Sequence, residues 1–225
     1  MYSKWLALAL VGSAVIFAST GCGSDASKAP AADTEAKAET EAPAAEAEAE
    51  PAAEEAYVNT AKDVELFAGD FVVGKDIVEG RYVVTTEEKA GTFIVYDSEG
   101  LPVTTEVLGT ATEMLAVEKI ELDLFEGQKV SVTGINKVQL KPATIEAKTE
   151  LTAGTYLVGR DVPVGDYVAT TEEKGGAFIV YDSNGLPKVS EILGKGDLGV
   201  EKIKVSLKDG DVLQLCNMNK VTLGQ

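Results

Sequence analysis

The stretch "TTEEKAGTFIVYDSEGLP" at Thr85–Pro102 returns as "TTEEKGGAFIVYDSNGLP" at Thr170–Pro187. Self-similarity at a fixed spacing is the signature of an internal repeat. From Gly80 to Pro102, eighteen of twenty-three positions are identical in the second copy, whereas only ten of twenty-four match between Val117 and Leu140. The sequence of one part of the repeat has therefore been retained more strictly than that of its surroundings.

The repeat extends well beyond this stretch. The two copies align at an offset of 85 residues as far as Gly109, and at an offset of 83 from Val117 onward. We place the first copy at residues 66–142 and the second at 151–225, with the connector "ATIEAKTE" between them.

Within a copy the pattern predicts short strands and tight turns. In "KIKVSL", Ile203, Val205 and Leu207 alternate with polar residues, as one face of a half-buried strand requires. The apolar runs "YVV" and "FIVY" predict central strands covered on both faces. We count six or seven strands per copy, which predicts an all-β fold of two tandem small β-sandwich or jelly-roll-like repeats after a disordered acidic linker.

Each copy is small for a domain that lacks a disulfide bond. A unit of about 75 residues buries a modest fraction of its surface and is marginally stable alone. We therefore expect the two copies to pack against each other, the alternative being two independent domains on a short linker.

Packing and turn chemistry do not explain the "TTEEK" segments, which we expect at hairpin tips exposed to solvent. One interpretation is a paired contact surface that meets a partner twice, and the other is a solvated turn with a weak Glu–Lys pair. The candidate binding residues are Glu87, Glu88, Lys89, Glu172, Glu173 and Lys174.

The N-terminal residues have the pattern of an export signal. Lys4 precedes an uncharged, mostly apolar run from Trp5 to Thr20, which is short for a transmembrane helix. We predict a signal peptide at residues 1–21. The following "STGCGSD" resembles the lipobox of bacterial lipoproteins, although Ser19 stands where that family usually has an aliphatic residue. The resemblance implies lipid on Cys22, which becomes the first residue of the mature chain.

A lipid on Cys22 implies attachment to the bilayer on the extracytoplasmic face of the cell membrane. A permanent transmembrane anchor and ordinary secretion with a free thiol at Cys22 are the alternatives. Residues 22–62 are rich in Ala, Glu, Thr and Pro and lack the apolar residues that build a core. We expect them to form a disordered, extended tether.

Composition excludes several functions. The chain has no histidine, which removes Ser-His-Asp and Cys-His catalysis and HExxH zinc sites. Its net charge of −17 disfavours nucleic acid as a partner. The turns at Asp97 and Asp182 have too few oxygen ligands for an EF-type calcium loop, and Cys216 is expected to be a half-buried structural residue. We expect no enzymatic activity, no cofactor and no metal.

The units "GDFVVGKDIVEGRY" and "GTYLVGRDVPVGDY" resemble the G-x-[FY]-x-V-G-x-D-[IV]-x-x-G-x-Y repeats of poorly characterised surface lipoproteins, mostly of Gram-positive bacteria. The resemblance implies an exported, repeat-built protein and no catalytic residues. We expect a binding module that meets an envelope polymer or a surface protein. The alternatives are a spacer without a small ligand and an enzyme that uses carboxylates.

Overall fold

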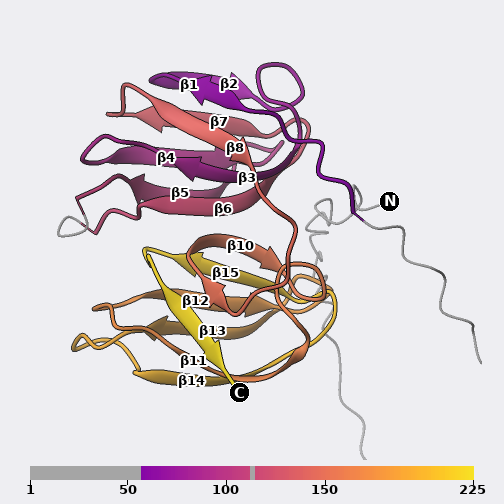
Figure 1. The fold of residues 1–225 in the computed structure, drawn as a ribbon, viewed down its shortest axis with the longest axis vertical. Helices are drawn as coiled ribbons and strands as arrows, with labels where there is room; N and C mark the ends of the chain where they lie inside the picture. Colours follow the sequence, from indigo (N-terminus) through magenta and orange to yellow (C-terminus); the bar gives the residue numbers. More distant parts are fainter. Residues whose placement is uncertain (1–56, 112–114) are drawn as a thin grey trace, which may run out of the picture. The chain divides into compact units, whose positions relative to one another are not determined.

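The structure, a computed structural model, describes residues 57–111 and 115–225 (Figure 1). The predicted signal peptide at 1–21, the lipidated Cys22 and the tether as far as residue 56 lie outside the described residues. All regular structure in the described part is β-strand, so the predicted all-β class is confirmed.

Each copy contains eight strands, not the six or seven that we counted from the sequence. Strands as short as β1, of three residues, and β9, of two, cannot show an alternating pattern in the sequence. The first copy comprises β1 (Val64–Leu66), β2 (Gly69–Val72), β3 (Gly80–Thr85), β4 (Gly91–Tyr96), β5 (Pro102–Leu108), β6 (Lys119–Leu124), β7 (Lys129–Thr133) and β8 (Val138–Pro142). The second comprises β9 (Glu150–Leu151), β10 (Ala153–Leu157), β11 (Gly165–Thr170), β12 (Gly176–Tyr181), β13 (Pro187–Leu193), β14 (Lys202–Leu207), β15 (Val212–Cys216) and β16 (Val221–Gly224).

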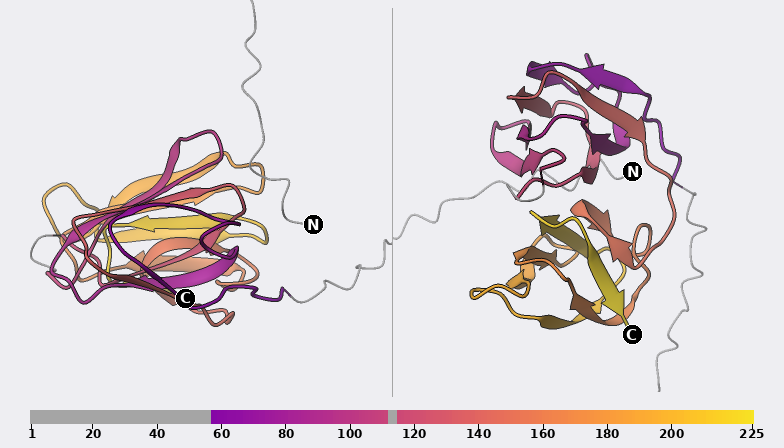
Figure 2. Two further views of the ribbon diagram at one scale, coloured as in Figure 1. Left: turned by 90° about the horizontal axis from the view of Figure 1, so that it is seen from above. Right: turned by 60° about the vertical axis from the view of Figure 1, so that its left-hand side comes forward.

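Both copies have the strand order of a jelly roll. In the first copy the strands pair as β1-β8-β3-β6 and as β2-β7-β4-β5. The second copy repeats this arrangement as β9-β16-β11-β14 and β10-β15-β12-β13. The two sheets of each copy face each other (Figure 2). The apolar side chains between them form one buried core in each copy. The jelly-roll interpretation is therefore confirmed.

The central position of the two apolar runs is also confirmed. Strand β3 lies between β8 and β6, and β4 lies between β7 and β5. Their inward side chains, such as Tyr82 and Phe93, are fully buried. The expectation that both faces are covered is met only in part, because the outward residues Val83 and Ile94 remain partly exposed.

The "TTEEK" segment is not a hairpin tip, and this prediction was wrong. Strands β3 and β4 belong to opposite sheets, so residues 86–90 form a crossover between the two layers. The true hairpin is formed by β4 and β5, which pair antiparallel around the turn at Asp97–Gly100. Two neighbouring apolar runs cannot show from sequence alone whether they pair with each other or face each other across a core.

The two copies pack against each other, as expected. Edge strand β6 of the first copy pairs in parallel with edge strand β10 of the second, with Ile120 opposite Ala153 and Glu121 opposite Gly154. This pairing merges one sheet from each copy into a single sheet of eight strands. A Cβ at Gly154 would overlap the carbonyl oxygen of Glu121, so the close approach requires glycine at this position.

A cluster of buried and partly buried charged side chains forms ion pairs at the boundary between the copies. Arg81 is 1% exposed and its Nη1 donates to Asp123 Oδ2 at 2.9 Å and to the carbonyl oxygen of Thr155 at 3.0 Å. Arg160 Nη2 lies 2.6 Å from the same Asp123 oxygen and 2.7 Å from Asp161 Oδ2. Each charge in the cluster has an opposite neighbour, which offsets much of the cost of burial.

Residues 57–62 belong to the fold, which corrects the predicted end of the tether. Asn59 Nδ2 donates to the carbonyl oxygens of Arg81 and Ala143, and the amide of Lys62 donates to the hydroxyl of Tyr82. Hydrogen bonds attach this segment to the first copy. The sequence did not reveal the attachment, because the segment has too few apolar residues to be recognised as part of a core.

Candidate functional site

The β3–β4 loop (residues 86–90) is fixed by its neighbours in the first copy. Buried Thr86 donates its hydroxyl to the carbonyl oxygen of Lys137 and accepts a hydrogen bond from the amide of Glu88. The amides of Thr110 and Ala111, in the β5–β6 loop, donate to the carbonyl oxygens of Glu88 and Lys89. Packing is so close that a Cβ at Gly109 would overlap Lys89.

The β11–β12 loop (residues 171–175) repeats this arrangement in the second copy. Thr171 donates to the carbonyl oxygen of Lys220, and the amides of Lys195 and Gly196 donate to the carbonyl oxygens of Glu173 and Lys174. These backbone contacts explain why both copies keep a threonine, at Thr86 and Thr171. They also explain why both keep a glycine next to the loop, at Gly109 and Gly194.

Two of the six candidate residues have structural contacts. Glu88 Oε1 accepts a hydrogen bond from Asn136 Nδ2 at 2.9 Å, and Glu173 Oε1 accepts one from the amide of Lys220 at 2.7 Å. Glu88 therefore contacts the β7–β8 turn and Glu173 the β15–β16 turn of its own copy, and both side chains are partly buried.

The other four candidate residues are exposed at the surface. Glu87, Lys89 and Lys174 are exposed and form no hydrogen bond or ion pair with another described residue through their side chains. Glu172 is 88% exposed at its side chain and pairs with Lys195. Such surface pairs contribute roughly 0 to 1 kcal/mol to stability.

Sequence reasoning missed two exposed leucines in the loops that hold these segments. Leu115, in the β5–β6 loop, is 62% exposed, and Leu198, in the β13–β14 loop, is 87% exposed. The two leucines are equivalent at the offset of 83 residues. The backbone of Leu115 has a φ of 60°, which residues other than glycine rarely adopt. The sequence did contain a signal for these residues, because both copies have a leucine at the same position of an otherwise polar loop.

A shared side chain connects the loops of the two copies. Asn219, in the β15–β16 turn, accepts from the amide of Glu118 at 2.7 Å and donates to the carbonyl oxygen of Ala116 at 3.2 Å. The adjacent Lys220 amide is the donor to Glu173. We call this connected set the loop belt: residues 86–90, 109–111, 115–118, 134–137, 171–175, 194–201 and 217–220. In each copy these loops lie at one end of the sandwich, on the left in Figure 1.

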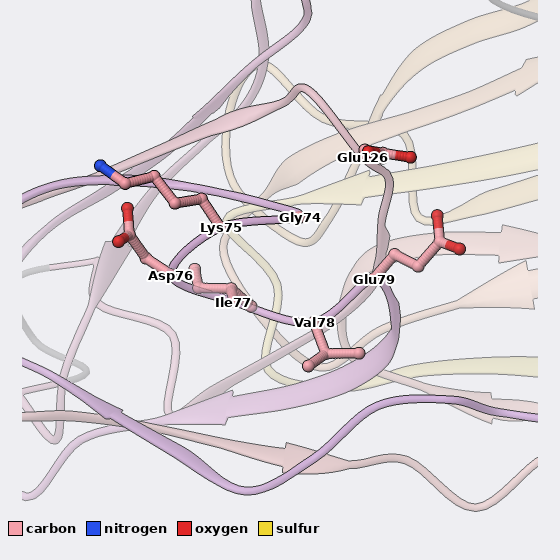
Figure 3. A pocket seen from close by; sticks show the side chains of 7 residues that line it. All are labelled: Gly74, Lys75, Asp76, Ile77, Val78, Glu79 and Glu126. Atoms are coloured by element: carbon pink, nitrogen blue, oxygen red, sulfur yellow. The ribbon is translucent and has the colours of Figure 1, made fainter.

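Two hollows lie away from the loop belt. One, of about 280 Å³, is formed by the β2–β3 loop and Glu126. Figure 3 shows Lys75 and Asp76 on one side of it and Glu79 and Glu126 on the other. The second, of about 350 Å³, lies over β11 and β14 and is lined by Asp166, Lys204 and Ser206 among others.

Asp97, Asp182 and Cys216, which the sequence offered as possible metal ligands or as a nucleophile, have structural roles. Asp97 Oδ1 accepts the amides of Glu99 and Leu101, and Asp182 Oδ1 closes the equivalent turn in the second copy. Burial, with the nearby Glu106 carboxylate, raises the pKa of the Cys216 thiol to about 12, so this thiol is not a ready nucleophile.

Glu106 is a buried carboxylate at the boundary between the two copies. It is 2% exposed, and its oxygens accept the amide of Asn217 at 3.0 and 3.3 Å. Burial raises its pKa to about 7, against an ordinary value of 4.5. A single such carboxyl, in contact with a strand of the other copy, acts as an interface residue.

Comparison of the chain with models of known protein families, with curated proteins and with solved structures finds no match. Within residues 57–111 and 115–225, no helix is long and apolar enough to cross a membrane. The same residues contain no cluster of three or more acidic, Cys or His side chains that could hold a metal ion.

Proposed function

We propose that this protein is a bacterial lipoprotein whose two jelly-roll repeats form a non-enzymatic binding module on the extracytoplasmic face of the cell membrane. Attachment rests on the sequence: an export signal, Cys22 in a lipobox-like setting and an acidic tether. Two acyl chains on one residue are sufficient for stable attachment to a bilayer.

The loop belt is the observation that supports binding. It presents the same side chains twice, Glu87 with Lys89 and Glu172 with Lys174, on backbones that are fixed by hydrogen bonds. Asn219 joins the loops of the two copies, so both contacts are presented by one connected unit. Two linked contacts of this kind raise the apparent affinity for a partner without any further chemistry.

The exposed leucines indicate what kind of partner fits. Leu115 and Leu198 lie in the same loops that hold the charged segments. Apolar side chains surrounded by charged ones are typical of protein–protein contacts. We therefore favour a protein of the cell surface over an envelope polymer. The acidic charge of the chain disfavours nucleic acid.

Cosedimentation with purified cell envelopes tests this function. The mature chain, residues 22–225, is produced in the cytoplasm so that it carries no lipid. We expect it to pellet with envelopes, and we expect a variant with Glu87→Ala, Glu172→Ala, Leu115→Ser and Leu198→Ser to stay in solution. A control with Glu79→Ala and Glu99→Ala removes two exposed carboxylates outside the loop belt and should still pellet.

Circular dichroism must show that all three chains are folded. Protease treatment of the envelopes before mixing should abolish pelleting if the partner is a protein, whereas pelleting that survives it points to a polymer. If the wild-type chain does not pellet, the binding function is refuted.

A spacer role is the second candidate, and the continuous sheet of eight strands favours it. Pairing of β6 with β10 makes the two copies one elongated sheet without needing any partner. In that case the loop-belt variant and the wild-type chain would behave alike in the envelope experiment.

A further inference from the structure

The boundary between the copies joins two different surfaces. The β6 edge of the first copy meets the β10 edge of the second. The equivalent strands are β14 in the second copy and β2 in the first, and each of these is the terminal strand of its sheet. Each end of the described unit therefore displays one half of the interface that its middle already contains.

The two free ends, at β14 and at β2, have features that correspond to the two sides of this interface. At the internal boundary, the β10–β11 loop carries Arg160 and Asp161 against Arg81 and Asp123. The hollow over β11 and β14 is lined by Asp166 and Ser206, which are the equivalents of Arg81 and Asp123. The second copy thus has an open hollow where the first copy receives a loop.

The loop that would fill this hollow is exposed at the other end. It is the β2–β3 loop, whose Lys75 and Asp76 are equivalent to Arg160 and Asp161 and are both exposed (Figure 3). Asp76 Oδ2 accepts the amide of Val72, just as Asp161 Oδ2 accepts that of Leu157, so the two loops share the same local hydrogen bond.

Charges at the two ends are complementary although their signs are exchanged. Internally, Glu121 pairs with Lys148 at 2.5 Å. Their equivalents are Lys204 and Asp63, which again have opposite charges. The Arg81 position holds Asp166 at the free end, and Lys75 lies in the loop that would reach it. Asp76 would repel Asp166, so this contact should be weaker than the internal one.

Several residues that are buried at the internal boundary are retained but exposed at the ends. Val117 is fully buried, and its equivalent Val200 is 42% exposed. Glu106 is 2% exposed, whereas its equivalent Glu191 is exposed. At the opposite end, Gly69 corresponds to Gly154 and leaves the edge of β2 without a Cβ that could block a partner strand.

We propose that copies of this protein associate head to tail, with β14 of one molecule pairing in parallel with β2 of the next. The occupant of each end is a second copy of the same chain. Such an interface joins unlike surfaces, so each added molecule leaves a free end and the assembly grows as a chain and not as a closed dimer. Exposed edge strands favour this type of pairing. This inference does not depend on the proposed binding function.

Sedimentation of the mature, unlipidated chain tests the assembly over concentrations from about 10 μM to about 1 mM, where weak contacts become populated. We expect the average mass to rise beyond that of a dimer without a plateau. Lys204→Glu and Asp63→Lys should each weaken association about ten-fold or more, because each places like charges at the contact. Lys141→Glu, an exposed residue on β8, makes the same change in charge as Lys204→Glu and should leave association unchanged.

Two rescues make the test specific. The double variant Lys204→Glu with Asp63→Lys restores opposite charges in the polarity of Glu121 and Lys148, and should associate like the wild-type chain. An equimolar mixture of the two single variants should associate as well, because each end meets its complement on the other chain. A monomer at the highest concentration, a closed dimer, or association that Lys204→Glu does not change would overturn the proposal.

Discussion

The two repeats have one topology but different surroundings, and the comparison separates residues that build the fold from residues that build the boundary. At the position of Arg81 and Asp166, the first copy buries a paired guanidinium and the second exposes a carboxylate. At the position of Glu121 and Lys204, a buried acid is replaced by an exposed base. Inward positions such as Phe93 and Phe178 are identical and fully buried in both copies. At these boundary positions the residue type changes together with its surroundings.

Removal of Arg81 should produce the largest difference between the copies. Arg81→Ala leaves Asp123 and Asp161 to share Arg160 in a buried setting, and should destabilise the chain by about 3 to 5 kcal/mol. Asp166→Ala, at the equivalent exposed position, should change stability by less than about 0.5 kcal/mol. Urea denaturation measures both. Equal effects would mean that the boundary charges do not stabilise the contact between the copies.

A glycine pair tests the strand contact itself. Gly154→Ala should cost about 2 to 4 kcal/mol more than Gly69→Ala, because only the new Cβ at 154 meets the carbonyl oxygen of a partner strand. The φ angles are 137° and 150°, so backbone strain is similar at both positions and largely cancels in the comparison. The difference in urea midpoint reports it, and a difference near zero would contradict the pairing of β6 with β10.

The two equivalent glutamates should differ in their effect on pH dependence. Burial raises the pKa of Glu106 to about 7 from 4.5, so the folded state favours the protonated form. Stability from this group is fully present below about pH 4.5 and is lost as pH rises through about 7, by roughly 3 kcal/mol. Glu106→Gln should flatten the stability profile between these values.

The matched control for this profile is Glu191→Gln, which changes an exposed carboxylate in β13. It removes the same carboxyl at the equivalent position of the second copy and should leave the profile as in the wild-type chain. A profile of the Glu106 variant that keeps the full slope would show that another group is responsible.

The smallest expected effects concern the two structural glutamates of the loop belt. Glu173→Ala removes the acceptor of a backbone amide and should cost about 1 kcal/mol, whereas Glu88→Ala loses only an exposed contact with the Asn136 side chain and should cost about 0.5 kcal/mol. Thermal unfolding followed by circular dichroism can resolve them. An effect of Glu87→Ala as large as that of Glu173→Ala would contradict the division into structural and exposed residues.

The sequence by itself determined the repeat, the all-β class and the central strands. These follow from patterns that are local or periodic: identity at a fixed offset, alternation in "KIKVSL", and continuous apolar runs at β3 and β4. The turns at Asp97 and Asp182 were equally readable, because the side chain closes the turn within four residues.

The tertiary structure alone decided which strands pair and what the retained "TTEEK" segments contact. Strands β3 and β4 are neighbours in sequence but lie in opposite sheets, and the loop between them is anchored by residues from two later loops. Pairing of β6 with β10 depends on a parallel contact between edges more than thirty positions apart, as from Ile120 to Ala153. Such contacts are selected by the free energy of packing two whole sandwiches, and no local pattern in the chain encodes them.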